Sequence, residues 1–140
     1  VYVNSINHGF DPFQYLAQIP VERTIQIHVA GHKQGAEFVI DTHGAPVIEP
    51  VFELLQYVLE RNDANAVMLE RDQNFPEFEE ILKELDKIRA ISEQSTALKK
   101  TGAAPRAASQ RRDFGRKWSA KSGLSRKDLA EVKHARVLSA

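Results

Sequence analysis

The spacing of hydrophobic residues divides the first 95 positions into strand-like and helix-like segments. Short apolar runs, continuous or alternating, occur at residues 24–31, 38–40 and 66–70 and predict β-strands. Apolar residues recur at helical spacing over residues 50–62 and 75–91, which predicts two amphipathic helices. This alternation of strands and helices is typical of an α/β protein.

Further features of the sequence add to the predicted strands and helices. Residues 1–7 alternate loosely, which predicts the end of a strand followed by a loop. Residues 11–19 begin with Asp11 and Pro12, a helix cap and a first-turn proline, so they predict a short helix. The last two apolar runs are uninterrupted, as in strands that are buried on both faces. In the last predicted helix, the inward residues are expected to be Phe78, Ile81, Leu82, Leu85 and Ile88.

The order of these elements is strand end, helix, strand, strand, helix, strand, helix. Such an order predicts parallel pairing with right-handed crossovers. Three or four strands do not close a barrel, but they match the C-terminal part of a (β/α)8 TIM barrel, about its last three to four strands with their helices. In that fold the active site lies at the C-terminal ends of the strands.

The distribution of charge separates the chain into two parts. Residues 1–95 carry 7 Lys and Arg against 16 Asp and Glu, whereas residues 96–140 carry 12 against 3. We therefore expect two regions: residues 1–95, the C-terminal portion of a barrel domain, and residues 96–140, a basic, flexible linker or tail. The second region contains Phe114, Trp118 and a part-helical pattern after Ser125, which suits a tail, a partner-docking segment or the start of another domain.

The composition narrows the chemistry further. The chain has no cysteine, so disulfides and thiolate metal sites are excluded. No apolar run approaches the roughly 20 residues that cross a bilayer, and we expect a cytoplasmic protein without membrane contact. The chain begins at Val1, without Met and inside predicted structure, so we expect a fragment of a longer protein.

Four polar residues at the C-terminal ends of the predicted strands suit a metal centre. They are His28, Asp41, His43 and Glu70. Residues i and i+2 of a strand point to the same side, so Asp41 and His43 would present a carboxylate and an imidazole together. Glu70 ends a buried strand where the neighbouring cation, Arg71, is expected to point to the opposite face. A carboxylate there needs a metal or another cationic partner.

These residues also have plain structural interpretations. The carboxylate–imidazole pair is equally consistent with a strand end that hydrogen-bonds a loop, and a single His28 in an apolar strand is more often structural. His32, His8 and Asp72 are candidates for contacts around the centre or to substrate, with ordinary loop positions as the alternative. As a set, the nitrogen and oxygen donors suit iron, manganese or zinc in a Lewis-acid or redox role, and bridging carboxylates would allow more than one ion.

Four stretches of sequence carry a resemblance to a known family. VYVNSINHGFDP, IQIHVAGH, VIDTHGAPV and MLERD resemble the C-terminal portion of the multinuclear non-haem iron-dependent oxidative enzymes, over roughly residues 1–92. HVAGH together with DTHGAPV is the most specific element. The resemblance implies a xylose-isomerase-like TIM barrel in which four residues are iron ligands on the last three strands: His28, Asp41, His43 and Glu70.

The resemblance also implies an activity, a cofactor and partners. The family holds two or three irons and uses oxygen to modify residues, commonly Cys, of ribosomally made peptides such as the methanobactin precursor. A partner protein often delivers the peptide. The family's earlier ligands, two His and a Glu, and an Asp-Val-Asn motif lie upstream of the part that matches this chain. The chain alone is therefore expected to hold an incomplete centre.

Two other classes of function remain open. The same superfamily includes isomerases and abasic-site endonucleases. The acidic residues 1–95 argue against nucleic-acid binding, because phosphate contacts need clustered Lys and Arg, although the basic tail could supply them. The non-enzymatic alternative is an inactive truncated product or a basic-tailed interaction module, whose barrel portion would expose sheet edges.

Overall fold

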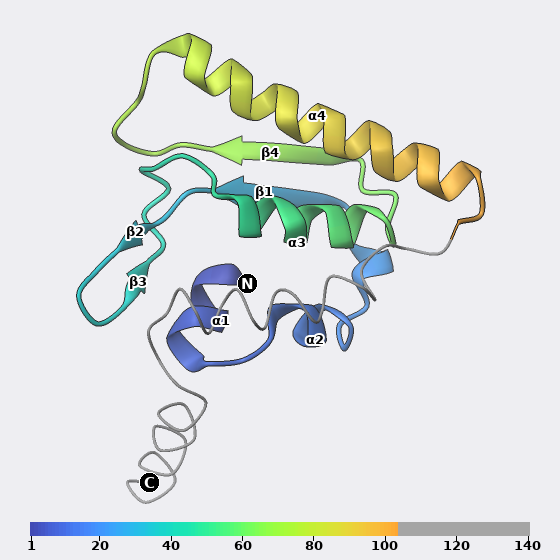
Figure 1. Cartoon of the computed structure of the whole chain (residues 1–140), viewed down its shortest axis with the longest axis horizontal. Helices are drawn as coiled ribbons and strands as arrows, with labels where there is room; N and C mark the ends of the chain where they lie inside the picture. The colour runs from blue at the N-terminus through green and yellow to red at the C-terminus, as the bar shows by residue number, and fades with distance from the viewer. Residues whose placement is uncertain (104–140) are drawn as a thin grey trace, which may run out of the picture. The chain divides into compact units, whose positions relative to one another are not determined.

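The computed structural model of the chain describes residues 1–103 (Figure 1), which lie within one compact unit, Val1–Pro105. Predictions that concern residue 104 onward, including the part-helical tail, lie outside the described residues. In chain order the elements are α1 (Tyr2–His8), α2 (Pro12–Leu16), the 3-10 helix η1 (Val21–Arg23), β1 (Gln26–Ala30), β2 (Lys33–Gln34), β3 (Val39–Ile40), α3 (Glu49–Leu59), β4 (Ala66–Glu70) and α4 (Phe78–Lys100).

Two parallel strands form the centre of the fold. β1 and β4 pair side by side, with His28 opposite Met68 and Ala30 opposite Glu70. α3 lies between them in sequence, and α3 and α4 pack against each other and against the strand pair (Figure 1). The predicted α/β class and the parallel pairing of these two strands are confirmed. The arrangement is consistent with part of a TIM-barrel-like fold.

The hydrophobic core lies on one face of this strand pair. Its buried members come from β1, the loop before α3, and the two long helices: Val29, Val47, Phe52, Leu55, Leu59 and Ile88. Ile27, Val67 and Leu69 pack against the same cluster. Because side chains alternate along a strand, His28 and Glu70 project from the opposite face. The strands are thus buried on one face, and the prediction that residues 66–70 are buried on both was wrong: Met68 is 45% exposed.

The N-terminal segment is a helix, and the prediction of a strand end at residues 1–7 was wrong. α1 ends at Gly9, which adopts the left-handed conformation (φ 65°) and donates its backbone N–H to the carbonyl of Ser5. A glycine in this conformation is a common helix C-cap. Asp11 caps α2 as predicted, because its side chain accepts from the backbone N–H groups of Phe13 and Gln14.

The run at residues 38–40 forms one arm of a hairpin, and the prediction of a strand buried on both faces was wrong. β2 and β3 pair antiparallel, and Gly35 donates its backbone N–H to the Phe38 carbonyl across the turn. Val39 is 4% exposed, whereas Phe38 and Ile40 are 58% and 52% exposed. Only the middle residue of the run therefore reaches the interior.

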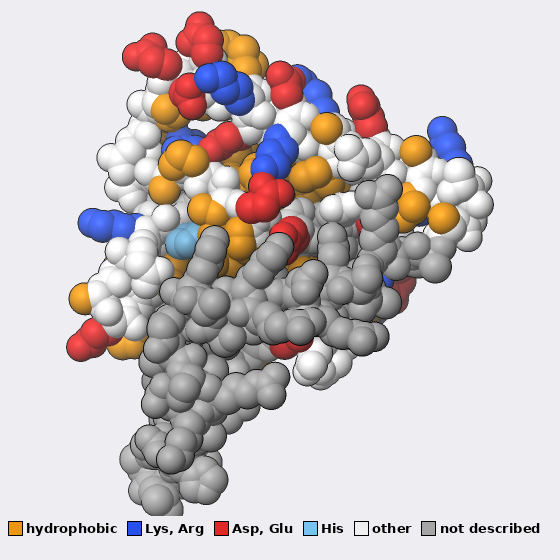
Figure 2. Space-filling view, in the orientation of Figure 1, with side chains coloured by type: hydrophobic (Ala, Val, Ile, Leu, Met, Phe, Trp, Pro, Cys, Tyr) orange, Lys and Arg blue, Asp and Glu red, His pale blue; other side chains and the backbone are white. Residues whose placement is uncertain are grey.

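The last helix is longer and more exposed than predicted. α4 passes the expected boundary between residues 95 and 96 and ends at Lys100. Of its predicted inward residues only Ile88 is buried, while Phe78 and Leu82 are exposed. Charged side chains of both signs gather over α4 on the face shown in Figure 2. Within residues 1–103, no helix is both long enough and apolar enough to cross a membrane.

Candidate metal centre

The four predicted ligands line one cavity at the C-terminal ends of β1 and β4. The cavity has a volume of about 280 Å³. Its walls include His28 and Ala30 from β1, Glu70 from β4, and residues of the loops that follow β1 and β3: His32, Asp41 and His43. α1 closes one side with Tyr2 and Val3. The predicted grouping at one end of the strands is therefore present in the structure.

Glu70 connects two imidazoles from different segments. Its Oε1 lies 2.9 Å from Nδ1 of His28, and its Oε2 lies 3.5 Å from Nδ1 of His43. The first contact joins neighbouring strands, because residues on the same face of β1 and β4 lie beside each other. The other ring nitrogen of His28, Nε2, lies 2.9 Å from the side-chain amide nitrogen of Gln26. The predicted direction of Arg71 is confirmed, since Arg71 pairs with Glu84 of α4 at 2.9 Å.

His43 stands at the centre of three carboxylates. Its Nε2 lies 3.2 Å from Oδ1 of Asp41, and its Nδ1 lies 3.0 Å from Oδ2 of Asp72, in addition to the contact with Glu70. Asp41 and His43 are thus close, as predicted, but a strand does not bring them together. β3 ends at Ile40, and His43 adopts a left-handed backbone conformation with φ 51°.

These side chains are open to solvent to different degrees. The side chains of His43 and Glu70 are 26% and 28% exposed, and that of His28 is 48% exposed. Asp41 and Asp72 are mainly exposed. An ion or a small polar group from solution can therefore reach the imidazoles and carboxylates of this cluster.

The other two candidate histidines differ in position. His32 lines the cavity and lies against Tyr2, with ring centroids 5.1 Å apart. Burial lowers the pKa of His32, and the negative charge of Asp41 acts in the opposite direction. Burial also raises the pKa of Tyr2. His8 is exposed in the last turn of α1 and is not among the residues that line the cavity. Sequence reasoning missed Tyr2, because its stretch had been assigned to a strand.

Gly31 allows the cavity wall to form. A Cβ atom at this position would lie 1.8 Å from the backbone carbonyl oxygen of Ala45. The loop before α3 therefore packs directly against the end of β1, and this packing brings the residues that precede Ala45, including His43, toward the strand ends. The absence of a side chain at Gly31 thus allows two backbone segments to approach each other.

The ligand assignment itself stays a prediction. Within residues 1–103, no group of three or more His, Cys, Asp or Glu side chains is arranged so that it could hold a metal ion. In the cluster described above, His43 contacts three carboxylates and His28 contacts one.

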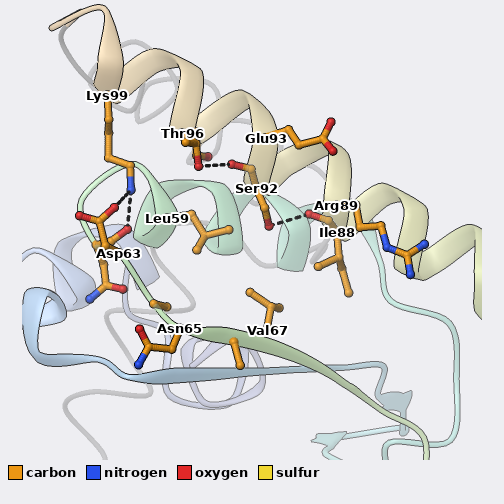
Figure 3. Close-up of a pocket in the computed structure, with 14 residues that line it drawn as sticks. Leu59, Asp63, Asn65, Val67, Ile88, Arg89, Ser92, Glu93, Thr96 and Lys99 are labelled. Atoms are coloured by element: carbon orange, nitrogen blue, oxygen red, sulfur yellow. Dashed lines mark hydrogen bonds and ion pairs between the residues drawn. The ribbon is translucent and has the colours of Figure 1, made fainter.

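A second pocket lies away from this cluster. Figure 3 shows it between α4 and the start of β4, with a volume of about 470 Å³. Lys99 reaches across its end to Asp63 and to the backbone carbonyl of Asn62. None of the predicted metal ligands lines this pocket.

Comparison with known proteins identifies the family. The family model described as RiPP precursor modification enzyme MbnB/TglH/ChrH matches residues 1–93. A UPF0276 protein of Caulobacter vibrioides is 49% identical over 90 residues, which are 64% of this chain and 32% of that protein. The UPF0276 protein PA14_21580 of Pseudomonas aeruginosa is 46% identical over 96 residues, 68% of this chain and 34% of that protein.

A third relative, a UPF0276 protein of Shewanella sediminis, is 45% identical over 89 residues, 63% of this chain and 32% of its own length. The chain spans about a third of the length of these curated relatives. The family match covers the cavity and every residue of the candidate cluster. The chain therefore belongs to the MbnB/TglH/ChrH family of RiPP precursor modification enzymes.

Proposed function

We propose that this chain supplies part of the iron centre of an enzyme that oxidatively modifies a ribosomally made peptide, commonly at Cys. The metal ligands would be His28, Asp41, His43 and Glu70. The observation that carries this proposal is Glu70, whose two carboxylate oxygens reach histidines of two separate segments. Family membership supports the peptide substrate class.

The types of donor atom in the cluster, imidazole nitrogen and carboxylate oxygen, suit a bound cation. A carboxylate can only accept hydrogen bonds, so an imidazole lone pair that faces one is repelled unless a proton or a metal ion lies between them. Ligands that share an edge around a first-row metal ion, each about 2.1 Å from it, lie about 3 Å apart. Nδ1 of His28 lies 2.9 Å from Oε1 of Glu70, and Nε2 of His43 lies 3.2 Å from Oδ1 of Asp41, and both distances are in this range.

The donor types narrow the identity of the ion. Imidazole and carboxylate without sulfur suit iron, manganese or zinc. We favour iron because the proposed reaction is an oxidation, and bound iron would supply the redox chemistry with oxygen. The chain's own residues would hold the ion at the open ends of the strands, and His32 and Tyr2 would form the adjacent wall against which a substrate lies.

Metal binding by the 140-residue chain tests the ligand assignment. Equilibrium dialysis against Fe²⁺ without oxygen should show binding to the wild type and binding at least about tenfold weaker to His43→Ala. His8→Ala is the matched control, because His8 is an exposed histidine that does not line the cavity. Equal iron binding by the two variants would contradict the assignment.

The oxidative step is proposed for a whole protein that contains this segment, together with its peptide and, where required, a delivery protein. In that protein His43→Ala should abolish the oxygen-dependent mass change of a Cys-containing precursor peptide, whereas His8→Ala should retain it. Mass spectrometry of the peptide measures both. Modification that persists in His43→Ala would contradict the proposal.

A further inference from the structure

Three consecutive residues after β4 hold the turn that carries His43. Asp72 donates its backbone N–H to the carbonyl of His43 at 3.1 Å. The side-chain amide of Gln73 donates to the carbonyl of Thr42, and that of Asn74 donates to the carbonyl of Gly44. We call residues 72–74 the clamp. Figure 1 shows the loop after β4 and the loop between β3 and α3 at the same end of the strand pair.

The backbone on both sides of this contact is unusual. Within residues 1–103, the non-glycine residues with positive φ are His43 and Asn74, and they lie on opposite sides of the contact. A Cβ atom on Gly44 would lie 2.6 Å from Cγ of Gln73, so a larger residue there would have to displace the Gln73 side chain. The left-handed conformation is unfavourable for histidine by itself. Contacts from the clamp therefore help to keep His43 in place.

The clamp also reaches the imidazole ring. Oδ2 of Asp72 lies 3.0 Å from Nδ1 of His43, closer than Oε2 of Glu70 at 3.5 Å. Because a carboxylate only accepts, the nitrogen next to Asp72 carries a hydrogen. Nε2 faces the carboxylate of Asp41 at 3.2 Å, so in the metal-free chain it carries a second hydrogen, which a metal ion would replace. A metal-bound histidine commonly donates its second ring N–H to a carboxylate in this way.

From these contacts we infer that Asp72 is a positioning residue, and that the clamp presents Nε2 of His43, with Nδ1 hydrogen-bonded to Asp72, to the metal. The part of this inference that concerns the metal rests on the proposed function. The orientation of the His43 ring does not depend on that proposal. The inference separates the roles of two nearby carboxylates. Glu70, at the end of β4, would bind the ion, whereas Asp72, in the loop that follows, would act through His43.

Three variants of the 140-residue chain test the inference, with Zn²⁺ alone as the probe. Asp72→Ala removes the acceptor, and Asp72→Asn keeps a carbonyl oxygen that can accept from Nδ1–H. Asp86→Ala is the matched control. Asp86 is equally exposed and also ion-paired, but its partner is Arg89 on α4. NMR of isotope-labelled histidine reports which ring nitrogen carries hydrogen and which binds Zn²⁺, a readout that a merely structural role would not move.

We expect Zn²⁺ to bind about 10- to 100-fold more weakly to Asp72→Ala, less than about tenfold more weakly to Asp72→Asn, and unchanged to Asp86→Ala. In the wild type, His43 should bind Zn²⁺ through Nε2 and keep hydrogen on Nδ1. Binding through Nδ1, or an Asp72→Ala affinity equal to that of the control, would overturn the inference.

The metal-free chain separates this inference from the proposed function. If the wild type binds no Zn²⁺, the ligand assignment fails. The spectrum of the metal-free chain then decides the orientation: a hydrogen-bonded Nδ1–H on His43 that is lost in Asp72→Ala supports the positioning role. Its absence from the wild type overturns that role.

Discussion

Gly31 and His43 show how single residues set the geometry of the cavity. Gly31 has no side chain to separate the end of β1 from the backbone of Ala45. His43 adopts a conformation that non-glycine residues avoid, and hydrogen bonds from the loop after β4 hold it there. Both residues serve close approach and orientation more than burial of apolar surface.

Gly31→Ala should destabilise the fold through a clash that the backbone must absorb. The added Cβ would meet the Ala45 carbonyl, and overpacking of this kind costs about 1–3 kcal/mol of unfolding free energy. Urea denaturation followed by circular dichroism measures the change. Gly102→Ala is a useful comparison, because nothing lies within 4 Å of its Cβ position and its left-handed φ alone should cost about 1 kcal/mol. Equal losses would show that the Ala45 contact is unimportant.

His32 should make stability depend on pH. Its pKa is lowered by burial, so the folded chain binds fewer protons than the unfolded chain near the unperturbed value of about 6.5. Stability from this residue is present above that value and is lost as the pH falls through it. Wild type should therefore lose more unfolding free energy than His32→Gln between about pH 7.5 and pH 5. Parallel pH profiles of the two proteins would contradict this prediction.

At the scale of elements, the hairpin of β2 and β3 depends on α1. The side chain of Asn7 donates to the Val39 carbonyl and accepts from the Val39 N–H, both at 2.8 Å. A side-chain amide thus satisfies both backbone groups of Val39, as a neighbouring strand would. The hairpin is fixed to α1, and Asp41 follows directly after its second arm.

Asn7→Ala should remove both hydrogen bonds and leave backbone groups of a buried residue without these partners. The expected loss of unfolding free energy is about 1–3 kcal/mol. Asn4→Ala is the matched variant, because Asn4 is exposed on the same helix, and it should change stability by less than about 0.5 kcal/mol. Thermal and urea denaturation of both proteins compare them. A neutral Asn7→Ala would show that the hairpin holds without α1.

Buried and exposed apolar residues of α4 should differ in how much unfolding free energy is lost when they are truncated to alanine. Ile88 is 5% exposed and packs in the core, whereas Leu82 is 37% exposed. Ile88→Ala should lower the unfolding free energy by about 2–5 kcal/mol, and Leu82→Ala by less than about 1 kcal/mol. Urea midpoints measure both. A larger loss in Leu82→Ala would mean that the exposed face of α4 is covered in solution.

At the scale of the whole described unit, one ion pair ties together three parts of the fold. Arg71 follows β4, and its guanidinium contacts both carboxylate oxygens of Glu84 on α4. The same carboxylate accepts from the backbone N–H of Val47, in the loop before α3. The Arg71 and Glu84 side chains are 6% and 14% exposed. The end of β4 and the loop before α3 are therefore fixed relative to α4.

Breaking this pair should be costly, because one charge would stay buried without its partner. Arg71→Ala is expected to lower the unfolding free energy by about 3–5 kcal/mol. Lys83→Ala removes an exposed ion pair with Glu80 on the same helix and should cost less than about 1 kcal/mol. Denaturation of both variants distinguishes the two pairs. Similar small losses would indicate that the Arg71 contact adds little.

The sequence by itself determined the elements whose signals are local. β1 and β4 follow from apolar runs, α3 from helical spacing and α2 from the cap at Asp11. The family also followed from the sequence, because its strings HVAGH and DTHGAPV are continuous. The grouping of His28 with Glu70 was predicted because parallel strands end at one edge, whereas Asp41 and His43 follow an antiparallel hairpin.

Only the tertiary structure decided how those residues are held. Asp72 lies 29 residues beyond His43 in the chain, and Asn7 lies 32 before Val39. Contacts over such separations leave no periodic pattern in the sequence, so the hairpin and the role of the clamp could not be predicted from spacing. The closeness of Asp41 and His43 was predicted correctly, but it was attributed to a strand. A left-handed turn held by residues 72–74 brings them together instead.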